Sequence, residues 1–401
     1  MKRVALVALA TTCCVVGSIT TASAFARSGI PALFSATSQS PSLADPSMIL
    51  IDSTTGEVVF EKDSTSLRKP ASVQKLFSAT AALEYLDPAY VFQTKVFLGD
   101  QPNTILITGE FDPWMASKYK DALSQHRVWV NFIANKAIAE IKSHSSKTLR
   151  SMTIEYNGVY SQDILAMHKY LLSKGIKSKE KPVASELIAS VESTEIASVS
   201  SPSVAEMIKF ALLWSDNLLA ERLARAAAHK AGFAMDDAGV SSVFHEVATR
   251  FGLDDSGLFV HDGSGLSKED RVTAKLVAEL LMKVHNVEKF AVLYEGLPVG
   301  GVSGTLENRF LKTVPDAVGL IHAKTGTLDG TVSLAGYIDA ADRQYVFVII
   351  ADRIPKGYLA TNRARTTVDT LVGKIASPLI NVPMTQPVQD QSALTTPEPT
   401  P

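Results

Sequence analysis

The stretch between Pro70 and Leu83 constrains the fold of this chain more than any other. Proline is favoured at the start of a helix, where its missing N–H costs no hydrogen bond. Behind it, apolar residues recur at the three- and four-residue spacing of one helix face. They are Leu76, Phe77, Ala79, Ala82 and Leu83. The sequence therefore predicts a helix whose first turn carries Ser72 and Lys75, three residues apart on the same face.

Ser72 and Lys75 are a candidate nucleophile and its base. A serine hydroxyl is a weak nucleophile at its own pKa and needs a base within hydrogen-bond reach before it attacks a carbonyl. A lysine serves as that base when burial or a neighbouring cation lowers its pKa. The Ser-x-x-Lys pattern alone also fits a solvated helix face, because short motifs match by chance. Partners elsewhere in the chain have to decide between the two interpretations.

A second motif, Ser215-Asp216-Asn217, follows an apolar segment at 204–213 that is predicted to be helical. In a purely structural interpretation, Ser215 is the N-cap of a helix beginning at Leu218. In a functional interpretation, the Ser215 hydroxyl relays a proton between Lys75 and a leaving nitrogen. The Asn217 amide would then donate to a substrate backbone while its oxygen accepts from Lys75.

A third motif, Lys324-Thr325-Gly326-Thr327, continues an apolar segment that is predicted to be a strand. The structural alternative is an edge-strand lysine that opposes aggregation. As a binding site, Lys324 and Thr325 would hold a substrate carboxylate by charge-assisted hydrogen bonds. Gly326 is expected to leave room for a substrate that lies against the strand.

The composition describes a globular chain without a nucleic-acid footprint. The 401 residues are enough for one large or two ordinary domains. There are 39 basic and 41 acidic residues, a net charge of −2, so a nucleic-acid partner is not expected.

The N-terminus has the pattern of a targeting segment. Lys2 and Arg3 precede an apolar stretch from Val4 to Gly17, and small residues before and at Ala24 suit cleavage there. Residues 1–24 are therefore predicted to be a signal peptide, and the mature protein is expected to be exported. An uncleaved membrane anchor is the alternative, since the uncharged segment is long enough to span a bilayer.

Both cysteines, Cys13 and Cys14, lie inside this segment. The mature chain would then have no disulfide, no thiolate metal site and no cysteine nucleophile. No metal or organic cofactor is expected.

Together the three motifs resemble one known set. Ser-x-x-Lys, Ser-Asp-Asn and Lys-Thr-Gly occur in this order in penicillin-binding proteins and class A β-lactamases. With their flanking residues, they resemble the D-alanyl-D-alanine carboxypeptidase/endopeptidase family, the low-molecular-mass class C penicillin-binding proteins. The segments that carry the resemblance are 69–75, 214–221, 262–267, 304–309 and 323–328.

The resemblance implies a mixed α/β (α+β) fold of the penicillin-binding and serine β-lactamase-like transpeptidase type, with an antiparallel sheet flanked by helices. It implies that Ser72 is acylated by peptidoglycan stem peptides ending in D-Ala-D-Ala, and by β-lactams as covalent inhibitors. Lys75 is then the base, and Ser215 with Asn217 forms the second catalytic element. Lys324, Thr325, Gly326 and Thr327 bind the substrate. The backbone N–H groups of Ser72 and Thr327 form the oxyanion hole.

The expected domain organisation follows from the composition of the chain and from the same resemblance. A flexible leader covers 25–46, and a serine D,D-peptidase domain is built from 47–91 and 199–380. A small insertion subdomain occupies 92–198, reduced relative to the family pattern, and a disordered tail covers 386–401. Residues 109–114 resemble only loosely the glycine-rich segment that the family carries there.

Three further features have no assigned role. Residues 262–267 are a family marker that also fits a Gly-Ser turn. Arg309 is a family position, and His322, two residues before Lys324, fits a structural role better than a catalytic one.

Two other functions remain open at this stage. A serine β-lactamase needs fast deacylation, and the glutamate motif that supplies it in class A enzymes is absent after Asn217. The other alternative is a peptidoglycan- or β-lactam-binding protein that acylates but barely turns over, or one with a degraded site. All the named catalytic residues are present, which argues against a degraded site. The oligomeric state and the choice between carboxypeptidase and endopeptidase are not predicted.

Overall fold

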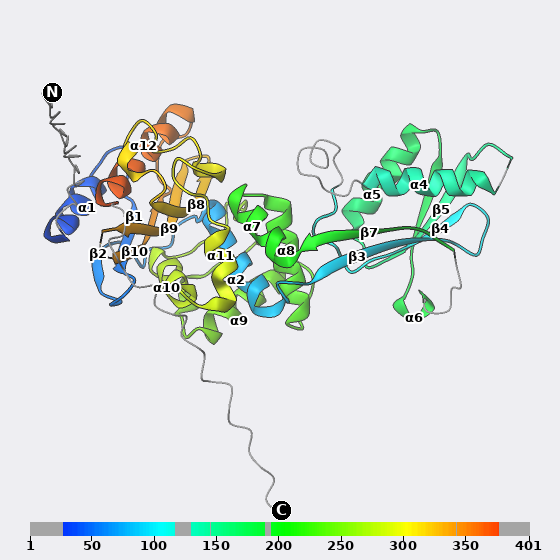
Figure 1. Cartoon of the computed structure of the whole chain (residues 1–401), viewed down its shortest axis with the longest axis horizontal. Helices are drawn as coiled ribbons and strands as arrows, with labels where there is room; N and C mark the ends of the chain where they lie inside the picture. Colours follow the sequence, from blue (N-terminus) through cyan, green and yellow to red (C-terminus); the bar gives the residue numbers. More distant parts are fainter. Residues whose placement is uncertain (1–26, 117–129, 145, 189–193, 342, 377–401) are drawn as a thin grey trace, which may run out of the picture.

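A computed structural model describes residues 27–116, 130–144, 146–188, 194–341 and 343–376. The predicted signal peptide and the predicted tail lie outside these residues. Figure 1 shows two lobes side by side, each built on its own five-stranded sheet. The larger lobe contains both ends of the described chain, and the smaller lobe extends from it on one side.

The sheet of the larger lobe has the strand order β2-β1-β10-β9-β8, with all neighbours antiparallel. This confirms the predicted antiparallel sheet flanked by helices. Its strands are β1 (Ser47–Asp52), β2 (Val58–Lys62), β8 (Ile321–Leu328), β9 (Thr331–Ala340) and β10 (Arg343–Ala351).

Side chains of this sheet alternate between two hydrophobic cores because successive residues of a strand point to opposite faces. In β1, Met48 and Leu50 pack into one core, whereas Ile49 and Ile51 pack into the other. The first core is closed by α1 (Ile30–Ser38) and α12 (Tyr358–Ile375).

The second core lies under a group of helices that includes the one with Lys75. These helices are α2 (Lys75–Tyr85), α7 (Val204–Leu213), α8 (Asn217–Lys230), α9 (Asp237–Arg250), α10 (Ala274–Val284) and α11 (Ala291–Glu295). Short 3-10 turns connect the elements of this lobe. They are η1 (Arg27–Gly29), η2 (Ala71–Gln74), η3 (Asp255–Gly257), η4 (Glu288–Phe290), η5 (Gly304–Leu306) and η6 (Pro315–Ala317).

The helix α1 corrects the prediction of a flexible leader over 25–46. Ile30 and Phe34 are four residues apart, so they lie on one helix face, and both are buried against the sheet. The Phe34 ring lies 5.4 Å from the ring of Phe60 on β2. The Ser-, Pro- and Ala-rich composition concealed this spacing, and Pro31 suits the first turn of the helix.

The smaller lobe lies between residues 91 and 203. Its sheet has the order β6-β5-β4-β3-β7 and mixes antiparallel with parallel pairs. The strands are β3 (Val91–Leu98), β4 (Thr104–Thr108), β5 (Ser151–Asn157), β6 (Lys177–Pro182) and β7 (Glu195–Ser203). The helices are α4 (Val130–Ser143), α5 (Ser161–Ser173) and α6 (Ser185–Ile188).

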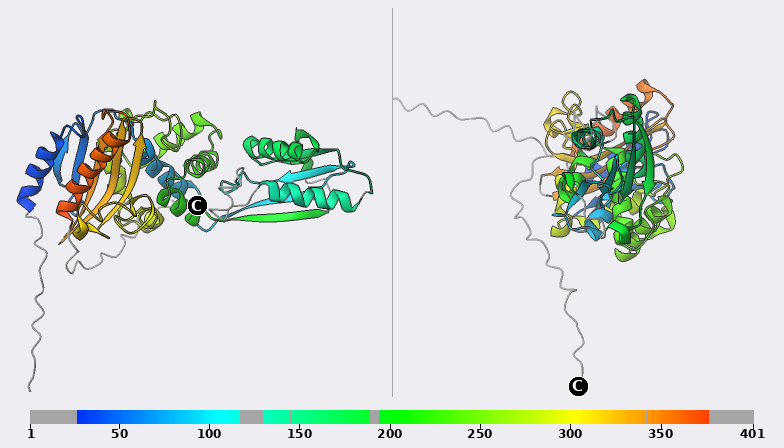
Figure 2. Two further views of the ribbon diagram at one scale, coloured as in Figure 1. Left: turned by 90° about the horizontal axis from the view of Figure 1, so that it is seen from above. Right: turned by 90° about the vertical axis from the view of Figure 1, so that its right-hand side faces the viewer.

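The lobe has a core of its own, formed by α4, α5 and one face of the sheet. Seen from above, β3 and β7 run back to the larger lobe as its two connections (Figure 2). A buried ion pair reinforces the junction, since Arg222 of α8 donates to Asp163 of α5 at 3.0 Å.

No helix of the described residues is both long and apolar enough to cross a bilayer.

Candidate active site

Ser72 lies in η2, the 3-10 turn that leads directly into α2. Lys75 is the first residue of α2, and its Nζ lies 2.8 Å from Ser72 Oγ. The tight turn brings the two side chains together because residues three apart in a 3-10 turn are aligned. The predicted pairing of hydroxyl and amine is therefore present in the structure.

Lys75 is almost fully buried and has two further acceptors. Its Nζ donates to Asn217 Oδ1 at 2.7 Å and to the backbone carbonyl of Ser264 at 2.6 Å. Burial lowers the pKa of Lys75 to about 7, against the opposing charges of Asp262, Asp216 and Glu221. A lysine with this pKa is partly neutral at neutral pH and can accept the proton of Ser72.

Ser215 lies in the connection between α7 and α8, and its φ of +57° is unusual for a residue with a side chain. The structure contradicts the alternative that Ser215 caps the next helix. Asp216 is the N-cap of α8, and its carboxylate accepts from the backbone N–H of Leu219 at 2.8 Å. The Ser215 hydroxyl is left to face the cleft, and it accepts from Lys324 Nζ at 2.9 Å.

Lys324 lies on β8 and is fully buried. Besides Ser215, its Nζ donates to the carbonyl of Thr325 at 2.9 Å. Burial, with the nearby charge of Lys75, lowers the pKa of Lys324 well below its usual value. The ammonium therefore lies behind Ser215 and not on the wall of the cleft.

Thr325 and Thr327 follow on the same strand and line the cleft. The Thr325 hydroxyl lies 2.8 Å from that of Thr305, and the Thr327 hydroxyl accepts from Arg365 at 2.9 Å. Because β8 is the edge strand of its sheet, one side of its backbone faces away from β9.

Gly326 has a different role from the one expected. A Cβ at this position would lie 2.1 Å from Ser333 Oγ and 2.8 Å from the carbonyl of Pro70. The glycine is therefore required for the close approach of β8 to the turn that carries Ser72. Its missing side chain does not provide room for a substrate.

The loop 262–267 is a part of the site that the sequence analysis left without a role. The Asp262 carboxylate organises it by accepting backbone hydrogen bonds of 2.6 to 3.2 Å. The donors are the N–H groups of Ser264, Gly265, Leu266 and Ser267. The loop thereby holds the Ser264 carbonyl on Lys75. The signal in the sequence is an aspartate directly before Gly-Ser-Gly, which is typical of such a turn.

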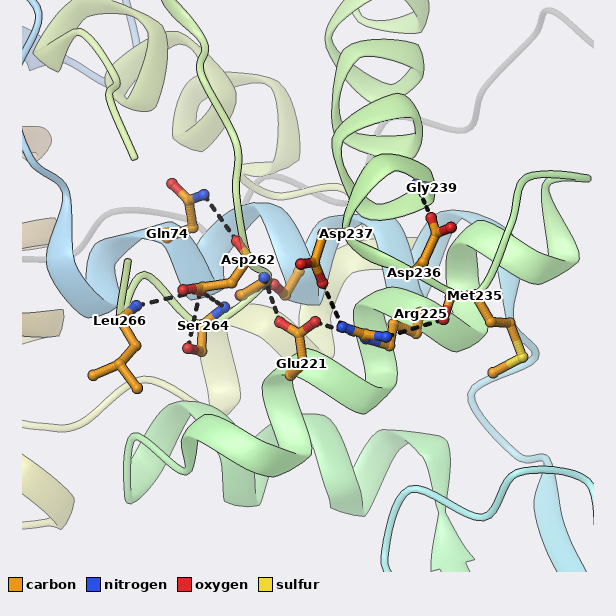
Figure 3. A network of polar contacts seen from close by, with 12 residues as sticks. Gln74, Glu221, Arg225, Met235, Asp236, Asp237, Gly239, Asp262, Ser264 and Leu266 are labelled. Atoms are coloured by element: carbon orange, nitrogen blue, oxygen red, sulfur yellow. Dashed lines mark hydrogen bonds and ion pairs between the residues drawn. The ribbon is translucent and has the colours of Figure 1, made fainter. Parts of the chain in front are cut away.

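Figure 3 shows how this loop is connected to η2 and α8. Gln74 Nε2 donates to the Asp262 carbonyl at 3.1 Å. From α8, Glu221 accepts from the N–H of Gly263 at 2.5 Å and from Arg225 Nε at 2.7 Å. Glu221 therefore fixes the loop from the side opposite α2, one turn after Asn217.

An open cleft of about 990 Å³ lies in front of Ser72, Ser215 and Asn217. Its far wall is formed by residues 305–313 and by α12. Arg309, which had no assigned role, forms a two-pronged ion pair with Asp369 of α12 and so joins these two segments. Among the described residues there is no cluster of three or more His, Cys, Asp or Glu side chains suited to a metal ion.

His322 lies behind the site. Its ring stacks on Tyr294 with 4.8 Å between the centroids, and burial lowers its pKa. This agrees with the structural role that was favoured for it.

The three motifs thus converge on one crevice, where the hydroxyls of Ser72 and Ser215 meet two amines and a carboxamide. This arrangement has a nucleophile with an adjacent base and a second hydroxyl that is hydrogen-bonded to another amine. Such a set can transfer an acyl group from a substrate to Ser72 and then from Ser72 to water.

The comparisons with known proteins agree with this chemistry. The model of the D-Ala-D-Ala carboxypeptidase 3 (S13) family matches residues 32–129 and 137–374. The chain is similar to carboxypeptidase DacB of Mycolicibacterium smegmatis, with 29% identity over 392 residues, covering 85% of this chain and 84% of that protein. It is 34% identical over 161 residues to a D-alanyl-D-alanine carboxypeptidase of Actinomadura sp., covering 39% of this chain and 29% of that protein.

Two solved structures show the same fold at low identity. Penicillin binding protein 4 of Haemophilus influenzae matches with a TM-score of 0.65 and 17% identity, covering 84% of this chain and 97% of that one. The predatory endopeptidase Bd3459 of Bdellovibrio bacteriovorus matches with a TM-score of 0.57 and 16% identity, covering 85% and 96%.

Proposed function

Since the chain belongs to the D-Ala-D-Ala carboxypeptidase 3 (S13) family and is a serine-type carboxypeptidase, we propose that its Ser72 cleft removes the terminal D-alanine of peptidoglycan stem peptides. The observation that carries the proposal is the position of Lys75 Nζ, within hydrogen-bond distance of both Ser72 Oγ and Asn217 Oδ1. Three segments far apart in the sequence have to fold correctly to produce it.

In the proposed acylation step, neutral Lys75 takes the Ser72 proton while Ser72 Oγ attacks the carbonyl carbon between the two D-alanines. The backbone N–H groups of Ser72 and Thr327 stabilise the negative charge that develops on the carbonyl oxygen. Ser215 passes its proton to the departing amine and receives the proton that Lys75 took from Ser72, while Lys324 holds the Ser215 hydroxyl in place. D-alanine leaves, and water then hydrolyses the ester on Ser72, returning the hydroxyl.

The substrate is proposed to lie along β8. An exposed sheet edge binds an extended peptide through backbone hydrogen bonds. β8 is the last strand of its sheet, and residues 298–300 bond to the first half of its outer edge, at Ile321 and Ala323, which leaves the half with Thr325 and Thr327 for a substrate. Asn217 lines the same cleft, and its amide N–H group is proposed to donate to the peptide backbone. A β-lactam carbonyl presents the same electrophile to Ser72, so penicillins are proposed to acylate it.

Cleavage of D-alanyl cross-links is the second reaction that the cleft permits. The same acyl-enzyme forms, and only the leaving group differs. The cleft of about 990 Å³ has room for a leaving group larger than alanine, and the structurally similar Bdellovibrio protein is an endopeptidase. Release rates from a monomeric and a cross-linked stem peptide would measure the balance between the two reactions.

We also propose that the enzyme acts outside the cytoplasm. This proposal rests on the basic, apolar and small-residue regions of the signal-like segment 1–24 and on the location of peptidoglycan, the proposed substrate.

The test is release of D-alanine from a diacyl-Lys-D-Ala-D-Ala peptide. Ser72→Ala and Lys75→Ala should each lower turnover by roughly 10³-fold or more. Ser242→Ala, which changes a serine on α9 away from the cleft, should behave as the unaltered enzyme. Near-normal turnover of the Lys75 variant would remove it from the mechanism, and no release by the unaltered enzyme would reject the reaction.

A further inference from the structure

A positively charged side chain lies at the far end of the cleft, on an element that none of the three motifs includes. Arg365 projects from α12, lines the same cavity as Ser72, and donates from Nη2 to Thr327 Oγ1 at 2.9 Å. The guanidinium is therefore in direct contact with the substrate-binding strand, although it is 38 residues away from Thr327 in the chain.

The groups around Arg365 are those that recognise a carboxylate. Thr325 and Thr327 are two residues apart on β8, so their side chains point to the same face, and both line the cavity. Two hydroxyl donors beside a planar guanidinium suit a two-oxygen anion, because arginine binds carboxylates through paired N–H groups.

The other cations nearby are less suitable for an incoming anion. Lys324 is fully buried and donates to Ser215 and to a backbone carbonyl. Arg309 is already paired with Asp369, and Lys312 is an exposed side chain.

Arg365 differs from these residues in how the nearest acid is engaged. Asp369 lies one turn further along α12 and its charge acts on Arg365, but this carboxylate forms its ion pair with Arg309. Within the described part of the chain, no carboxylate lies at ion-pair distance from its guanidinium. Burial, together with the charge of Arg309, lowers the pKa of Arg365, and the charges of Asp369 and Tyr358 oppose this shift only in part. An added carboxylate would stabilise the charged form.

We propose that Arg365 is a further substrate-binding residue, which binds the C-terminal carboxylate of the substrate together with the hydroxyls of Thr325 and Thr327. This proposal rests on the proposed function. It assigns to Arg365 the charge recognition that the sequence analysis gave to Lys324, whose buried ammonium instead supports Ser215. Carboxypeptidase specificity would then depend on α12 as well as on the three motifs.

The experiment compares two substrates that differ only in this charge. Diacyl-Lys-D-Ala-D-Ala and its C-terminal amide are given to the unaltered enzyme, Arg365→Gln, Arg365→Lys and Arg363→Gln. Arg363 is an exposed arginine on the same helix and does not line the cleft, so it is the matched control. Release of D-alanine or D-alaninamide gives kcat/KM, and the thermal midpoint of each variant checks its folding.

Arg365→Gln should lower kcat/KM on the acid by about 10- to 100-fold, the usual effect of losing a charged hydrogen bond. The kcat/KM on the amide should change little, so the preference of the enzyme for the acid over the amide falls. Arg365→Lys, which keeps the positive charge, should retain part of this preference. Equal losses on both substrates, or no loss on either, would overturn the assignment of Arg365 alone. An unaltered enzyme that releases neither product would instead overturn the proposed function, and this assignment with it.

Discussion

The pH dependence of acylation should follow the pKa of Lys75. Burial lowers that pKa to about 7, and only the neutral amine can take the Ser72 proton. Neutral Lys75 is populated above its pKa, so kcat/KM should rise with pH and level off above about pH 8. At pH 5, two units below the pKa, about 1% of Lys75 is neutral, and kcat/KM should be about 100-fold below the plateau.

A charge substitution gives this prediction a second test. Glu221 raises the pKa of Lys75 by its negative charge, so Glu221→Gln should lower the pKa and move the rising limb to lower pH. The glutamine oxygen can still accept from the N–H of Gly263, which limits the disturbance of the loop. Glu279→Gln removes the same charge on α10, where Glu279 has only a distant pair with Lys275, and should leave the limb in place.

The assay is initial-rate release of D-alanine between pH 5 and pH 9, at substrate concentrations well below KM. The substrate carboxylate stays ionised throughout this range, so the limb reports the enzyme. A flat profile, or one that falls as pH rises, would refute Lys75 as the base. An upward shift of the limb in Glu221→Gln would refute the electrostatic account of its pKa.

Three further substitutions test the structure around the site. Arg222→Ala removes one partner of a fully buried ion pair and should lower the free energy of unfolding by about 3–5 kcal/mol, measured by denaturant titration. Burial raises the pKa of Asp270 to about 7, so in the folded state it holds a proton that the unfolded chain has lost above about pH 4. The stability that protonated Asp270 contributes is fully present below about pH 4 and is lost as the pH rises to about 7. The thermal midpoint of the unaltered protein should therefore fall over this window, and Asp270→Asn should reduce that fall. Gly265→Ala places a Cβ 1.9 Å from the carbonyl of Ala71 at a φ of +76°, and should abolish acylation of the neighbouring Ser72, measured as loss of D-alanine release.

The sequence predicted the site best where the spacing of two reactive residues alone fixes their contact. The Ser-x-x-Lys spacing predicted the contact between Ser72 and Lys75, because a helical turn brings residues three apart together whatever surrounds it. The long-range contact with Asn217 was predicted from the resemblance, since no local pattern joins residues 142 apart.

Backbone groups and single charges could not be predicted in the same way. The Ser264 carbonyl reaches Lys75 only because Asp262 folds its loop over α2, and any residue has such a carbonyl. Arg365 is one arginine of an amphipathic helix until α12 packs beside β8. The helix α1 has the Ser-, Pro- and Ala-rich composition of a linker, so only the four-residue spacing of Ile30 and Phe34 indicates it in the sequence.

The most direct test of the account locates the acyl group. The protein is incubated with penicillin, the reaction is stopped with acid, and peptide mass mapping identifies the residue that carries the adduct. The account predicts one penicilloyl group on the peptide containing Ser72, and no adduct in Ser72→Ala. An adduct on another residue, or one that persists without the Ser72 hydroxyl, would contradict the claim that the three motifs form a single acylating site.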